Sequence, residues 1–100
     1  MLDLLLSTTI NTAQIQLVAQ SQASTVYLPI STRQSSRPNC VTYTATNSTG
    51  RTVRNVKVNR RNRQGKIEQE RLTPSLAAGK TTSFEQCQSH GSFVNVEAKQ

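Results

Sequence analysis

The stretch CVTYTATN, residues 40–47, decides the fold because apolar and polar side chains alternate along it. In an extended strand this alternation places Val41, Tyr43 and Ala45 on one face and the threonines on the other. The stretch leads directly into Asn47-Ser-Thr-Gly50, which has the residue types of a tight turn. A half-buried strand that ends in such a turn is the building unit of an antiparallel β-sheet.

The same unit recurs further along the chain, and no segment has the apolar spacing of a long helix. Four more strands are predicted, at residues 52–59, 66–72, 81–88 and 93–98, with turns at 62–65 and 89–91 and a longer connection at 74–79. Short strands separated by polar turns are typical of a sandwich or barrel. We therefore predict an all-β sandwich domain over residues 37–100.

The first 36 residues differ in composition from the rest, since they are rich in Ser, Thr and Gln and have no Lys or Arg before Arg33. Such a segment resembles a linker, and we predict an extended N-terminal arm over residues 1–36. Alternating apolar residues around Pro29 predict an edge strand at 25–31. We expect the arm to contact neighbouring chains through its apolar residues, which are Ile10, Ile15, Leu17, Val26, Leu28 and Ile30.

Positive charge is concentrated in one predicted hairpin of a chain whose formal net charge is +7. Residues 51–66 contain seven basic residues and no acid: Arg51, Arg54, Lys57, Arg60, Arg61, Arg63 and Lys66. A block of this kind predicts an acidic partner, and a solvated, solubilising face is the alternative. The absence of aromatic residues from this stretch makes nucleic acid a weaker candidate than an acidic protein surface.

The two cysteines, Cys40 and Cys87, are too few for a thiolate zinc site. Paired, they would close a loop whose cross-link contributes about 4 kcal/mol in the chain-entropy model. A reduced, buried pair is the alternative, and the sequence leaves both readings open.

Part of the sequence resembles a known group of domains. The segments TNSTGRTVRNVKV (46–58), QGK (64–66) and LAAGKTTSF (76–84) are similar to the FxLYD and CARDB group of immunoglobulin-like domains. The resemblance implies an immunoglobulin-like β-sandwich with a binding or structural role. The chain departs from the group at Arg60, Arg61 and Arg63, where related domains carry large apolar residues.

No catalytic pattern stands out, so we expect neither an enzyme, a cofactor nor a metal site. His90, the single histidine, falls in a Ser-His-Gly turn that suits a solvent-facing side chain.

The favoured hypothesis is a structural interaction protein of a large assembly, similar in design to the cement or decoration proteins of tailed-phage capsids. Its basic hairpin would bind an acidic face of a major capsid protein, and the chain would form a homo-oligomer such as a trimer, or exchange arms. A capsid location after synthesis in the host cytoplasm follows, because neither a signal-peptide core nor a membrane-spanning run is evident. The alternatives are a bacterial surface or secreted adhesion module and a nonspecific nucleic-acid binder.

Overall fold

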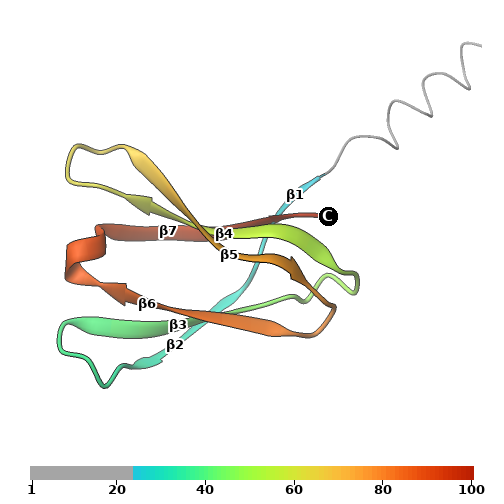
Figure 1. The fold of residues 1–100 in the computed structure, drawn as a ribbon, viewed down its shortest axis with the longest axis horizontal. Helices are drawn as coiled ribbons and strands as arrows, with labels where there is room; N and C mark the ends of the chain where they lie inside the picture. Colours follow the sequence, from blue (N-terminus) through green and yellow to red (C-terminus); the bar gives the residue numbers. More distant parts are fainter. Residues whose placement is uncertain (1–23) are drawn as a thin grey trace, which may run out of the picture.

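The computed structural model describes residues 24–100, which form two antiparallel sheets packed face to face (Figure 1). The predicted all-β sandwich is therefore confirmed. One short 3₁₀ helix, η1 (Gln88–His90), precedes the last strand. The strands are β1 (Thr25–Tyr27), β2 (Ile30–Gln34), β3 (Cys40–Thr46), β4 (Val53–Arg61), β5 (Ile67–Leu76), β6 (Thr81–Cys87) and β7 (Ser92–Lys99).

One sheet has the strand order β1-β7-β4-β5 and the other the order β2-β3-β6. The central pairs, β4 with β7 and β3 with β6, correspond to the C–F and B–E pairs of an immunoglobulin-like sandwich. In that architecture the neighbour of strand F is a full-length strand G. Here the corresponding neighbour of β7 is β1, which pairs with only three β7 residues, Glu97 to Lys99.

Residues 25–34, which the sequence assigned to the arm, contribute a strand to each sheet. β1 runs antiparallel to β7, and β2 pairs along β3. The chain crosses between the sheets at Leu28 and Pro29. The Leu28 amide still donates to the Val96 carbonyl at 3.0 Å, whereas Pro29 has no N–H to lose at the crossing. Sandwich strands thus begin upstream of residue 37.

The buried core is made of small and medium aliphatic side chains: Leu28, Ala45, Val53, Val56, Val58, Leu76, Val96 and Ala98. Val26 and Ile30 pack against this cluster. Among the alternating residues around Pro29, Leu28 is therefore part of the core of its own chain, whereas Val26 and Ile30 are half-buried against it. Ile10, Ile15 and Leu17 lie outside the described residues.

Strand β5 is longer than predicted, because it continues through Pro74 to Leu76 instead of giving way to a loop. Proline is tolerated here because β5 is the edge of its sheet, and Pro74 has no register partner on β4. The extension carries Leu76 into the core, where it is 8% exposed.

Asn47 fixes the corner between the two sheets and is fully buried. Its Nδ2 atom donates to the carbonyls of Arg51 at 2.6 Å and Leu76 at 2.9 Å, and its Oδ1 atom accepts from the Thr49 amide at 3.1 Å. The sequence predicted only a turn residue at this position. The side chain satisfies backbone groups of its own turn and the buried carbonyl of Leu76, which lies 29 residues along the chain.

Candidate partner-binding surfaces

Three connections meet at one end of the sandwich: the β2–β3 loop, the β4–β5 turn and η1 (Figure 1). Four exposed cations lie there, and we call this group the basic end: Arg37, Arg61, Arg63 and Lys66. Arg37 and Arg63 line the same hollow of about 400 Å³, although they come from different sheets. The basic end is therefore built from separate parts of the chain.

The hairpin turn that carries three of these cations is held by its own hydrogen bonds. The Asn62 Oδ1 atom accepts from the amides of Gln64 at 3.0 Å and Lys66 at 2.9 Å. Gly65 has a φ of 82°, a conformation that favours glycine. The Arg61 guanidinium donates to the Gly65 carbonyl at 2.9 Å. The cations thus extend from an ordered turn, which lowers the entropy cost of binding.

The seven basic residues predicted as one binding hairpin lie in four different environments. Arg51 and Arg54 are exposed at the start of β4, and the nine residues of that strand separate them from the basic end by roughly 25 Å. Lys57 is half-buried on the outer face of its sheet, opposite Glu97. The remaining strand position, Arg60, points inward. Only Arg61, Arg63 and Lys66 reach the basic end.

Arg60 lies on the inner face of β4, in line with Val56 and Val58, and is 8% exposed. Its Nε donates to the Gln86 side-chain oxygen at 2.7 Å and its Nη1 to a Glu70 carboxylate oxygen at 2.6 Å. The guanidinium also lies 5.5 Å from the centre of the Phe84 ring. These contacts satisfy a buried charge and fill the end of the core. Arg60 is therefore unavailable to a partner.

The cations of the hairpin turn form no ion pair with a carboxylate among residues 24–100. The ion pairs in that part of the chain are Arg60 with Glu70 and Arg37 with Glu85, the second at 3.8 Å. Arg61, Arg63 and Lys66 therefore contribute a positive field, which Glu68 and Glu70 oppose in part, since both line a second hollow together with Arg63. Such a field steers acidic molecules toward this end.

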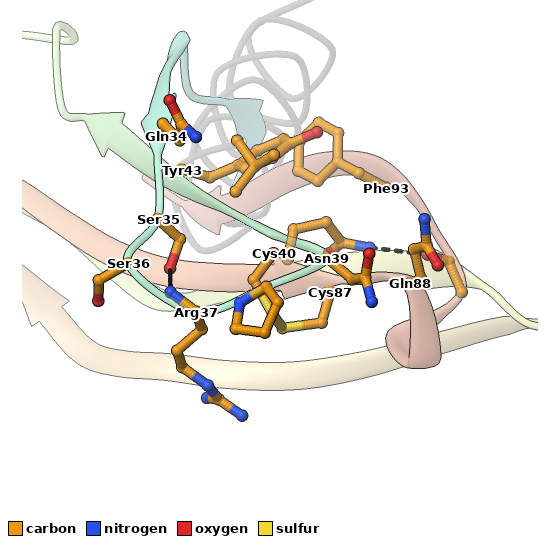
Figure 2. Close-up of a pocket in the computed structure, with 14 residues that line it drawn as sticks. Gln34, Ser35, Ser36, Arg37, Asn39, Cys40, Tyr43, Cys87, Gln88 and Phe93 are labelled. Carbon is orange, nitrogen blue, oxygen red and sulfur yellow. Dashed lines mark hydrogen bonds between the residues drawn. A yellow bond between two sulfur atoms is a disulfide. The ribbon is translucent and has the colours of Figure 1, made fainter.

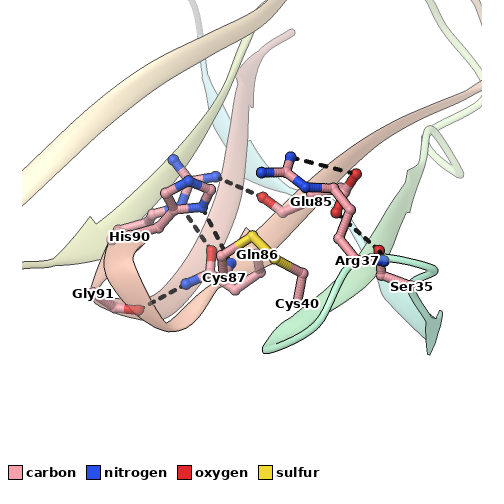
Figure 3. The surroundings of a disulfide bond; sticks show 9 residues. Ser35, Arg37, Cys40, Glu85, Gln86, Cys87, His90 and Gly91 are labelled. Atoms are coloured by element: carbon pink, nitrogen blue, oxygen red, sulfur yellow. Dashed lines mark hydrogen bonds and ion pairs between the residues drawn. A yellow bond between two sulfur atoms is a disulfide. The ribbon is translucent and has the colours of Figure 1, made fainter.

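A disulfide joins Cys40 at the start of β3 to Cys87 at the end of β6 (Figure 3). The Cys87 amide donates to the His90 Nδ1 atom at 3.1 Å, and Ser35 donates to the Glu85 carboxylate at 2.9 Å. Glu85 lies close enough to both sulfurs to suggest a metal site, with the candidate ligand atoms within 4.8 Å. The two sulfurs are bonded to each other, so neither offers a thiolate ligand.

A second surface is an open hollow of about 610 Å³ between the two sheets, near the disulfide (Figure 2). Tyr43 and Phe93 lie at its base with their ring centres 4.7 Å apart. Val41 follows the inward alternation of Tyr43 and Ala45 but remains 39% exposed. Sequence reasoning placed Val41 and Tyr43 on the core face. The sequence did not show that this part of the core is uncovered. It is uncovered because β1 pairs with only a short part of β7.

Comparison of the chain with protein-family models, with curated proteins and with solved structures found no match. The described part of the chain holds no helix long and apolar enough to cross a membrane.

Proposed function

We propose that this chain is a non-enzymatic structural interaction protein that docks its basic end on an acidic surface of a partner protein. The observation that carries the proposal is the set of exposed cations Arg61, Arg63 and Lys66, which have no carboxylate partner among residues 24–100. Arg60, in contrast, is buried and paired with Glu70, so its charge is already used inside the domain. An ordered turn presenting unpaired cations suits recognition of a complementary acidic surface.

The assembly that best suits this module is a viral capsid, on which the chain would act as a cement or decoration protein and stabilise neighbouring subunits of the major capsid protein. A small sandwich adds little mass to a shell, and a weak electrostatic contact gains strength when it is repeated over many copies. Binding through the basic end leaves the opposite end of the sandwich, with Ser24 and Gln100, free for further contacts.

A bacterial surface or secreted adhesion module is the second candidate, and the Cys40–Cys87 disulfide favours it. Disulfides form and persist in oxidising compartments and are rare in reducing cytosol. The two candidates predict different redox histories for the same domain. Trapping free thiols by alkylation during lysis separates them, because a surface module carries the bond when isolated and a cytoplasmic capsid precursor carries two free thiols.

Support for a non-enzymatic role comes from the surroundings of the polar side chains. The ring nitrogen Nδ1 of His90 accepts from a backbone amide and is engaged in a turn. Glu70 is paired with Arg60, and both cysteines are bonded to each other. These groups have structural partners in the described part of the chain, which is unlike a nucleophile held beside a base.

The test compares two triple variants with the same loss of charge. One changes Arg61, Arg63 and Lys66 to Ser, and the matched control changes the exposed residues Arg51, Arg54 and Lys80 to Ser. Binding to polyglutamate and to duplex DNA is measured by titration over a range of salt concentrations. We expect the basic-end variant to lose about tenfold or more in affinity for polyglutamate, while the control loses much less.

Equal losses in the two variants would mean that the net charge attracts the polyanion, and the assignment of the basic end would be abandoned. Tighter binding to DNA than to polyglutamate, with a steep salt dependence, would favour the nucleic-acid reading instead.

A further inference from the structure

The edge of β7 is only partly covered, and the uncovered part is a continuous backbone edge. Residues Glu97 to Lys99 pair with β1, and the Val96 carbonyl accepts from Leu28. Among the preceding residues, Ser92, Phe93 and Asn95 have register partners on β4 alone, and Val94 has none on either side. An unpaired strand edge is a template for another strand.

The open hollow beside this edge exposes core-facing apolar groups. Phe93 of β7 and Tyr43 of β3 lie at its base, and Val41 on the same inner face is 39% exposed. Gln34, at the end of β2, borders the opposite side. A strand laid along Ser92–Asn95 would cover these rings with every second side chain, in the place that strand G takes in an immunoglobulin-like sandwich. Edge and hollow together fit an extended apolar segment.

The chain itself contains a segment with the required pattern. Residues 13–19 read AQIQLVA, so Ala13, Ile15, Leu17 and Ala19 alternate with Gln14, Gln16 and Val18. This stretch contains no charge, no proline and no glycine, each of which disfavours insertion as a buried strand. Its spacing is that of a strand with one apolar face.

The position of Ser24 indicates which molecule supplies the segment. The Gln100 amide donates to the Ser24 carbonyl at 2.9 Å, so the chain enters the sandwich at the C-terminal end of β7. The free edge is at the N-terminal end of the same strand. Between Ser24 and this free edge, the edge of β7 is occupied by β1 and Leu28. To reach its own hollow, a segment preceding Ser24 would have to turn back past β1, whereas the hollow of a neighbouring copy needs no such reversal.

We infer that residues 13–19 of a second copy add a strand to the Ser92–Asn95 edge of β7 and insert Ile15 and Leu17 over Tyr43 and Phe93. The eight Cα–Cα steps from Leu17 to Thr25 span up to roughly 27 Å when extended, enough to bridge two adjacent sandwiches. Because donor and acceptor lie at opposite ends of the domain, the contact is head-to-tail. Successive copies then form an open chain, or a ring if the rotation closes. This inference goes beyond the proposed function and does not depend on the basic end.

The experiment uses the full chain and two double variants. Ile15→Asp with Leu17→Asp places charge on the inserted face, whereas Gln14→Asp with Gln16→Asp places the same charge on the opposite face. Sedimentation across a wide concentration range gives the mass of each. We expect the wild type and the Gln variant to assemble with rising concentration, and the Ile15/Leu17 variant to remain monomeric because its affinity for a second copy falls by at least about 100-fold.

Hydrogen exchange locates the acceptor. The amides of Ser92–Asn95 should be protected in the assembled wild type and unprotected in the Ile15/Leu17 variant, and adding a synthetic peptide of residues 10–20 should restore that protection. A wild type that is monomeric at every concentration overturns the inference, including the case in which the same amides are protected because the segment fills its own hollow. Equal assembly of both variants, or protection at another edge, overturns it as well. Both variants retain the basic end, so the result is independent of polyglutamate binding.

Discussion

Reducing the Cys40–Cys87 bond should remove most of the stability of this domain. The bond closes a loop with a sequence separation of 47 residues. In the chain-entropy model, a loop of this length contributes about 4 kcal/mol at 25 °C. Small domains unfold with a total of roughly 5–15 kcal/mol, and a core of valines, alanines and two leucines places this one near the lower limit. The reduced domain should therefore retain only about 1–2 kcal/mol.

Urea unfolding of the oxidised and reduced protein, followed by far-ultraviolet circular dichroism, measures the difference. For a slope of about 1–2 kcal/mol per molar urea, the midpoint should fall by roughly 2–4 M on reduction. The Cys40→Ala, Cys87→Ala double variant is the control. Its urea midpoint should match that of the reduced protein and should not change when reductant is added. A loss below about 1 kcal/mol would refute the loop-entropy reasoning.

The remaining predictions concern the buried residues Asn47 and Arg60 and the half-buried Gly91. Asn47→Ala should lower the free energy of unfolding by about 2–4 kcal/mol, because it leaves the backbone groups that the amide satisfies without a partner. Asn47→Asp should not restore the bonds to the Arg51 and Leu76 carbonyls, since a carboxylate cannot donate. Urea unfolding measures both variants. Gly91→Ala should cost at least about 2 kcal/mol, because φ is 84° and a Cβ would meet the Arg61 carbonyl oxygen at 2.5 Å; an unchanged melting temperature would contradict this. Arg60→Ala should destabilise by about 2–3 kcal/mol, whereas Arg60→Met should fall within about 1 kcal/mol of wild type, because the apolar side chain fills the same space without a charge to satisfy. If Met were as harmful as Ala, the ion pair with Glu70 would matter more than packing.

The alternation of residues 40–47 was enough to predict β3, its inner face and the turn that follows, because a period of two depends on local sequence alone. The burial of Arg60 could not be predicted from local sequence alone. A run of cations predicts a charged surface, but strand parity places Arg60 in line with Val56 and Val58. Its burial is tolerable only because Gln86 and Glu70 arrive from other strands. No local pattern encodes those partners.

Residues 25–34 were assigned to the arm because the sequence does not show which distant strands they pair with. β1 is three residues long and becomes a strand only against the last strand of the domain. The alternation around Pro29 predicted one edge strand over residues 25–31, whereas the structure divides this stretch between the two sheets, because β1 pairs with β7 and β2 pairs with β3. The hollow near Phe93 was also not predictable, since it results from an incomplete neighbour of β7 that pairs with three residues.

The position of the disulfide also determines how this domain responds to mechanical force. Tension applied through Ser24 and Gln100 pulls apart two adjacent, antiparallel strand ends, so the bonds between β1 and β7 break one after another instead of sharing the load. Extension then stops at Cys40 and Cys87. The loop between them, with a sequence separation of 47 residues, cannot lengthen while the bond is intact, which withholds roughly 150–170 Å of contour length. An oxidised chain of such domains would yield easily at first and then become stiff, and reduction would convert it into a far more extensible tether.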